Sequence, residues 1–198
     1  MSNGTAAIGD RVEIGDDTDL FAVRANDYHP GDNVSVRSGV SAAPPLPIVT
    51  PCCSIPAITC GGDLVIVRRG EALSITPGTY GALRVYNGAR LNLAPGLYVF
   101  CSIKVGRDAQ VTPQGAVRID VAGTIRVGVD SHLEPAPGQP AVIVNVAGKK
   151  IKLTQNAVAR AFVTAPNAQI RLGRGATFEG GFCVKNAQTD KHATLQCP

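Results

Sequence analysis

The sequence predicts an all-β protein, a single-stranded, right-handed parallel β-helix, and two observations lead to this fold. The first is composition: of 198 residues, 22 are Gly and 14 are Pro, none is Trp, and only 5% are aromatic. Such a chain has few helix formers and many turn residues. The second is an internal repeat, in which short strands and turns recur with the same residue types at the same positions. The length suits one domain.

A three-residue pattern, usually apolar, basic, apolar, recurs along most of the chain. Successive copies begin 18, 20, 22, 26 and 19 residues apart. The copies occupy residues 65–67, 83–85, 103–105, 125–127, 151–153 and 170–172. Because side chains alternate between the two faces of a strand, each copy is expected to be a half-buried strand.

Three further columns of the repeat describe how the chain turns. Five residues after each start stand residue types that tolerate a left-handed backbone: Gly70, Gly88, Asp108, Asp130, Asn156 and Gly175. One position later the last five copies have small residues: Ala89, Ala109, Ser131, Ala157 and Ala176. Two positions further the residues are mostly large and apolar: Leu73, Leu91, Val111, Leu133, Ala159 and Phe178. Each unit is therefore a strand, a tight corner and a second strand.

A unit of this size is too short to bury its own apolar side chains. Stacking the units in parallel, about 4.8 Å apart, completes both the hydrogen bonds and the core. Residues 64–198 are expected to form this β-helix, with a C-terminal cap. The inward ladder is expected to consist of Leu83, Ile103, Ile125, Ile151 and Ile170.

Residues 1–63 are expected to be an irregular N-terminal section of the same domain. Residues 1–32 hold seven acids and two bases, a net charge of −5, whereas the rest of the chain carries +9. Apolar residues between positions 8 and 36 indicate weaker rungs, packed at one end of the helix or along its flank. The proline-rich stretch from Pro44 to Pro56 is stiff and extended, and is expected to run along the helix.

Six cysteines, an even number, indicate disulfides and an oxidising compartment. The spacing of Cys52, Cys53 and Cys60 does not fit a zinc site. Cys101 and Cys183 would stand about four turns, or roughly 19 Å, apart, which is too far for a disulfide. Cys183 is therefore expected to pair with Cys197, and Cys101 with Cys52, Cys53 or Cys60.

Two copies of the repeat carry a Pro-Gly-x-Tyr turn, Pro77–Tyr80 and Pro95–Tyr98, before an apolar strand. A late segment, residues 162–184, contains an Ala-Pro-Asn-Ala turn and an Ala-x-Phe-x-Gly ending. These motifs resemble the β-helical regions of bacterial cell-surface proteins associated with tight-adherence and type IV pilus systems. The resemblance covers about residues 64–184, and it implies a β-helical fold and a cell-surface location.

The sequence offers little for catalysis. A polysaccharide-cleaving β-helix would need two carboxyl groups that face each other across the substrate. Asp108 and Asp130 fall in the turn column, and Asp120 has Asn145, not an acid, at the equivalent position of the next turn. His132 falls at an outward rung position. No catalytic residue, metal site or cofactor is therefore predicted.

The middle position of the repeated tripeptide is the most distinctive candidate site. After Ile66 it is basic in every copy: Arg84, Lys104, Arg126, Lys152 and Arg171. In register, these five cations would line one outward face over about 19 Å. They can serve solubility, since basic stems cover an apolar sheet, or they can bind an anionic polymer. The column contains no aromatic residue, so stacking on bases is not expected.

These observations favour a non-enzymatic, extracellular or cell-surface β-helix module with a structural or adhesive role, such as an assembly subunit. A β-helical carbohydrate-active enzyme and a self-assembling filament protein of the bactofilin kind are the alternatives. Expected partners are further copies of the chain, end to end or side by side, or an anionic polymer. Membrane insertion and sequence-specific nucleic-acid binding are not expected. The threonines fall in different columns, which disfavours ice binding.

Overall fold

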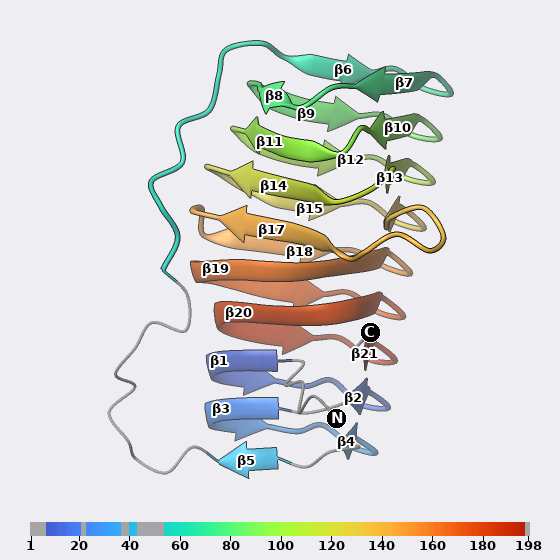
Figure 1. The fold of residues 1–198 in the computed structure, drawn as a ribbon. Coiled ribbons are helices and arrows are strands. Elements are labelled where there is room, and N and C mark those ends of the chain that lie inside the picture. The colour runs from blue at the N-terminus through green and yellow to red at the C-terminus, as the bar shows by residue number, and fades with distance from the viewer. Residues whose placement is uncertain (1–6, 21–22, 37–39, 43–53, 197–198) are drawn as a thin grey trace.

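The structure of the protein is a computed structural model that describes residues 7–20, 23–36, 40–42 and 54–196. These residues form parallel strands that stack as a β-solenoid of about nine turns, as Figure 1 shows. The described part of the chain contains no helix, and so none that could cross a membrane. The predicted fold class is confirmed.

Each full turn has three sides, and equivalent strands of successive turns pair along each side. The first side carries β6 (Val65–Val67), β9 (Ala82–Val85), β12 (Ser102–Val105), β15 (Ile125–Val127) and β18 (Lys150–Leu153). The second carries β7 (Ala72–Ile75), β10 (Arg90–Leu93), β13 (Gln110–Pro113), β16 (His132–Leu133), β21 (Thr194–Gln196), β2 (Asp19–Leu20) and β4 (Ser35–Val36). The third carries β8 (Gly78–Thr79), β11 (Gly96–Phe100), β14 (Val117–Val121), β17 (Val142–Val146) and β5 (Val40–Ala42). Two long strands, β19 (Val158–Leu172) and β20 (Thr177–Thr189), run over all three sides. Two others, β1 (Ala7–Glu13) and β3 (Val23–His29), bend from the third side to the first.

The core is a set of apolar ladders that run along the solenoid axis. The predicted ladder is confirmed: Leu83, Ile103, Ile125, Ile151 and Ile170 are successive partners in the strand register. Each of these side chains is at most 4% exposed. Equivalent apolar residues therefore bury one another from turn to turn, which no single turn could achieve.

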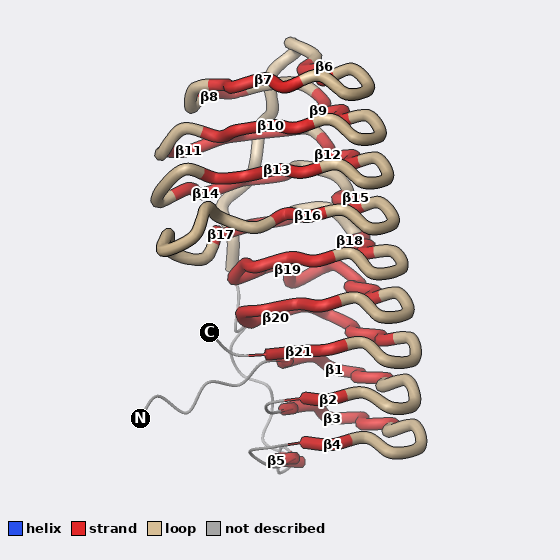
Figure 2. The backbone as a smooth tube through the Cα atoms, turned by 90° about the vertical axis from the view of Figure 1, so that its right-hand side faces the viewer, coloured by secondary structure: helices blue, strands red, loops and turns tan. Residues whose placement is uncertain are grey.

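The corner between the first and second sides is the same in every turn. All six residues of the predicted turn column have positive φ, and three residues outside the aligned repeat, Asp17, Asn33 and His192, share this conformation. The φ values of the nine lie between 51° and 73°. The small residues that follow are buried inside the corner, where Ala89 and Ser131 are 0% exposed. Figure 2 shows these corners as loops stacked along one edge of the molecule.

The N-terminal strands continue the solenoid beyond its C-terminal end. β1 pairs in parallel with β20, and β2 pairs with β21 (Figure 1). At this joint the Lys191 Nζ atom lies 2.7 Å from a carboxylate oxygen of Asp16, and this contact raises the pKa of Lys191 and lowers that of Asp16. The N-terminal turns therefore pack at one end of the helix, which is one of the two positions expected for them, and they cover the strands that a C-terminal cap was expected to close.

Residues 54–63 run along the flank of the solenoid to the opposite end, where the chain enters β6 (Figure 1). A disulfide between Cys60 and Cys101 fastens this segment, with the two Cα atoms 5.0 Å apart. Cys101 therefore pairs with one of its three predicted partners, and the pairing with Cys183 that spacing had excluded does not occur. Cys183 is also disulfide-bonded. The predicted Cys183–Cys197 bridge and the cysteines Cys52 and Cys53 involve positions outside the described residues.

The substitution Ile125→Ala should test the axial core ladder. Truncating a buried Ile leaves a cavity, and we expect the free energy of unfolding to fall by about 2–5 kcal/mol. The neighbouring exposed residue gives a matched control, because Arg126→Ala should change stability by no more than about 0.5 kcal/mol. Urea denaturation followed by circular dichroism measures both. Equal effects of the two substitutions would contradict the inward and outward assignment.

Replacing Cys60 and Cys101 together by Ser should lower the free energy of unfolding by roughly 2–4 kcal/mol, because the disulfide joins residues 41 positions apart and so closes a loop in the unfolded chain. Peptide mapping without reduction should recover the fragments containing Cys60 and Cys101 as one species. The same digest tests the Cys183–Cys197 prediction. Recovery of Cys101 as a free thiol would contradict the described linkage.

Candidate anionic-ligand site

The basic column forms a continuous ridge on the first side of the solenoid. Strand register places Arg84 beside Lys104, Lys104 beside Arg126, Arg126 beside Lys152, and Lys152 beside Arg171. We call these five residues the basic ridge. At about 4.8 Å per turn, it spans roughly 19 Å. All five side chains point away from the core because the residues on either side of each one point inward.

Four of the five ridge cations have no ion-pair partner within the part of the chain that the structure describes. The exception is Arg171, whose guanidinium donates to both oxygens of Asp190 at 2.9 and 3.3 Å. Arg84, Lys104 and Arg126 are exposed and Lys152 is half-buried. The positive field of this surface therefore comes mainly from the four residues on β9, β12, β15 and β18, held close together by the strand register.

The ridge is bounded at both ends. The next residue in the column above Arg84 is Ile66, and below Arg171 the column continues with Gln188, Glu13 and His29. The acidic N-terminal section thus begins two turns below Arg171, with the turn that carries Gln188 in between. The charge asymmetry of the sequence becomes a separation along the axis, with cations over the middle turns and acids near one end.

Tyr86 is the site residue that the sequence did not reveal. It follows β9 directly, and its side chain is 48% exposed. The equivalent residues of the next two turns are Gly106 and Gly128, and a Cβ at Gly128 would collide with the carbonyl oxygen of Gly106. Two glycines beside one aromatic ring leave the surface hollowed next to Tyr86. A signal was present in the sequence, since Tyr86 occupies a position that later turns fill mostly with glycine.

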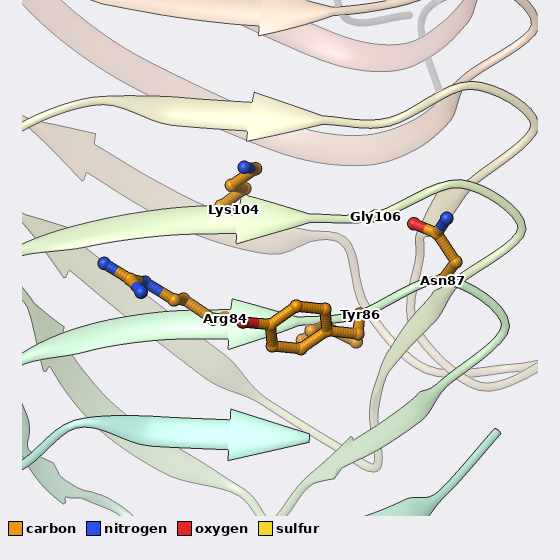
Figure 3. Close-up of a pocket in the computed structure, with 6 residues that line it drawn as sticks. Arg84, Tyr86, Asn87, Lys104 and Gly106 are labelled. Carbon is orange, nitrogen blue, oxygen red and sulfur yellow. The ribbon is translucent and has the colours of Figure 1, made fainter. Parts of the chain in front are cut away.

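The hollow is a shallow depression of about 460 Å³ on the upper end of the ridge. Its lining consists of Arg84, Val85, Tyr86, Asn87, Lys104 and Gly106. In Figure 3 the two cations extend from neighbouring strands, and the Tyr86 ring lies back along β9 toward Arg84. A second depression of about 260 Å³ lies against Ile66, Arg68, Arg69 and Tyr86. An exposed aromatic ring thus lines the same depressions as guanidinium and ammonium groups, a combination suited to an anionic sugar.

The carboxylates of the repeat region form ion pairs or stand at corners of the solenoid. Asp120 forms an ion pair with Arg118 at 2.9 Å and accepts a hydrogen bond of 2.7 Å from the Asn145 amide. Glu134 lies 2.6 Å from His132. Glu71, Glu179 and Asp190 face Arg68, Arg160 and Arg171. Asp108 and Asp130 form corners, as expected.

Among the described residues no group of three His, Cys, Asp or Glu side chains is placed to hold a metal ion. His132 points outward, as its column predicts, and its ring nitrogen contacts Glu134.

Fold and surface together define the class of the protein: a disulfide-bonded parallel β-solenoid with a basic ridge on its first side. No family model matches the sequence, and no curated protein matches it. Among solved structures, an ice-binding protein from an Antarctic biological consortium is similar over 99% of this chain and 88% of that chain, with 15% sequence identity and a TM-score of 0.45.

Replacing Lys104, Arg126 and Lys152 together by Ser should leave the fold intact. Adjacent like charges on a sheet repel one another, so the thermal midpoint should stay the same or rise slightly. Circular dichroism melts at low ionic strength measure this. A loss of more than about 1 kcal/mol would show that the stems of these side chains stabilise the sheet by packing.

Proposed function

We propose that this protein is a rigid, non-enzymatic, extracellular structural and adhesive module that binds an acidic polysaccharide through the basic ridge. The observation that carries the proposal is the ridge itself: four cations without ion-pair partners among the described residues, on four consecutive turns, with the exposed Tyr86 ring at one end. Cations held this close cost stability through repulsion, which a polyanion would relieve.

The ridge suits a polymer better than a small anion. Its cations are spread along the axis at about one per 4.8 Å, and the depressions beside Tyr86 are shallow. A chain with regularly spaced carboxylates or sulfates can meet several of them at once, and its release of counterions would favour binding. The Tyr86 ring offers an apolar face on which a sugar ring can stack, while the neighbouring Asn87 amide can bond a hydroxyl group.

The extracellular location is supported by the Cys60–Cys101 disulfide and by the disulfide-bonded state of Cys183. The cell-surface role, with an association with tight-adherence or pilus systems, rests on the Pro-Gly-x-Tyr and Ala-Pro-Asn-Ala motifs. The solenoid form fits such a role, because its axial hydrogen bonds and ladders make a stiff spacer. The carbohydrate-active enzyme is less well supported, since the repeat-region acids are ion-paired or form corners.

Binding of fluorescently labelled heparin and polygalacturonate, measured by anisotropy between 50 and 500 mM salt, tests the proposal. The parent protein should bind at low salt, with a double-logarithmic salt slope of about −2 to −4, as four phosphate-like contacts would give. The Lys104, Arg126 and Lys152 triple Ser variant should bind weakly and show a slope of about −1, because Arg84 is the one ridge cation left without an ion-pair partner among the described residues. A matched triple, Arg90, Lys149 and Lys185 to Ser, removes the same charge away from the ridge and should retain most of the binding.

The substitution Tyr86→Ser separates stacking from charge. It should weaken binding of the two polysaccharides roughly threefold to tenfold while leaving the salt slope unchanged. Duplex DNA, which presents phosphates but no open sugar face, should bind both proteins equally. Salt-independent binding, or no binding to either polysaccharide, would contradict the proposal and would favour a role of the ridge in solubility.

A further inference from the structure

Both ends of the solenoid present open strand edges. At the upper end of Figure 1, β6, β7 and β8 each pair with only one neighbouring strand among the described residues. At the lower end the same holds for β4, for β5 and for the Asp27–His29 part of β3. Within the described ranges, each of these edges carries a row of backbone groups without a ladder partner, which can receive a further strand.

Core side chains are also uncovered at these ends. Leu73 belongs to an inward column whose next members, Leu91 and Val111, are at most 2% exposed, yet Leu73 itself is 37% exposed. At the other end Tyr28, Val34 and Val36 are only partly buried. Solenoids usually end in a polar cap, and within the described residues neither end has one.

We propose that copies of this chain assemble end to end, with β6, β7 and β8 of one copy stacking as the next turn beneath β3, β4 and β5 of another. The partner is a second copy of the chain, and the joint would continue the parallel hydrogen bonding of the solenoid. This inference goes beyond the proposed polysaccharide binding and does not depend on it.

The columns of the repeat continue across such a joint. Within one copy, the inward column of the first side begins at Val65 and ends at Tyr28. In the assembly, the residue below Tyr28 would be Val65 of the following copy. In the same way, Val36 would meet Leu73. At the corner, Asn33 would lie over Gly70, and both already have positive φ, at 55° and 73°. Apolar residues would cover apolar residues, and the corner geometry would be preserved.

The joint between the C-terminal and N-terminal strands is an internal example of the same contact. There, the Lys191 ammonium of one turn lies 2.7 Å from the Asp16 carboxylate of the next, and the His192 backbone N–H donates to the Asp16 carbonyl at 3.1 Å. An ion pair between a lysine and an aspartate that are far apart in sequence thus joins the C-terminal turn to the N-terminal turn. Lys191 and Asp16 occupy equivalent corner positions of successive turns. One turn below Asp16, the equivalent residue is Asp32, the last acid before the lower edge.

Asp32 has the right chemistry to repeat this contact with Arg69. Arg69 occupies the same column position in the first turn, is exposed, and has no ion-pair partner within the described residues. The backbone also fits. The Asn87 side chain accepts a hydrogen bond from the Arg107 N–H, and Asp16 accepts one from the Asp32 N–H, each at 3.0 Å. In the assembly Asp32 would accept from the Arg69 N–H and pair with its guanidinium, so a basic end would meet an acidic end.

Charge reversal across the joint tests the proposal. Sedimentation velocity of the full chain from 1 μM to 1 mM in 50 mM salt should show concentration-dependent oligomers. Electron microscopy should show rods with an axial repeat of about 43 Å, the height of about nine turns. Asp32→Arg and Arg69→Asp should each raise the concentration needed for assembly roughly tenfold or more, because each places like charges in contact.

An equimolar mixture of the two single variants should assemble near the parent concentration, with the two variants alternating along the rod. In that order one joint keeps the original charge pair and the next carries the reversed pair, so every joint brings opposite charges together. The double variant, with both charges reversed in one chain, should likewise recover assembly. Failure of both the mixture and the double variant to recover would contradict a direct contact between positions 32 and 69.

Two controls separate this joint from other effects. Arg107→Asp makes the same substitution at the same corner position of an interior turn, and should assemble like the parent. The ridge triple Ser variant should also assemble normally, so failure of polysaccharide binding and failure of assembly are separate results. A parent that stays monomeric at 1 mM, or oligomers unaffected by either single reversal, would overturn the proposal.

Discussion

Every feature of this protein depends on one constraint: parallel backbone hydrogen bonds hold each turn directly above the next. Equivalent residues of neighbouring turns are therefore forced together, whatever their chemistry. Apolar residues such as Ile103 and Ile125 become a core, residues with positive φ such as Asp108 become a corner, and cations such as Lys104 and Arg126 become a ridge. The same constraint that stabilises the apolar columns brings like charges together, so a basic column in this fold costs stability through repulsion.

The sequence predicts the middle of the solenoid well and its ends poorly. Where the repeat is visible, column and register follow from it, as Leu83 and Ile170 show. The N-terminal turns lack the tripeptide, although Val12 lies in the same inward column as Ile170. Local pattern identifies such strands, but any open parallel edge of the right length could receive them. Their position beneath β20 is decided by tertiary contacts, among them the ion pair between Asp16 and Lys191.

The candidate site is likewise predictable from the sequence only in part. The ridge cations were predictable because they share a column. The role of Tyr86 was not, because the hollow beside its ring depends on Gly106 and Gly128 in other turns. Cys101 was predictable as a disulfide cysteine, but the choice of Cys60 depends on the path of the segment that crosses the flank. Repeat periodicity carries no information on that path.

The order of the turns along the axis differs from their order along the chain, and this has a consequence for synthesis. Residues of β1 and β2 leave the ribosome well before the strands that receive them, β20 and β21. The hydrogen bond from the Gly15 N–H to the Thr189 hydroxyl joins residues 174 positions apart. Contacts of such long range form slowly, since a large loop must close before they contribute. The N-terminal turns can pair with one another early, β1 with β3 and β2 with β4, but the edge that meets β20 and β21 stays open until those strands are made. The central turns can stack before this docking.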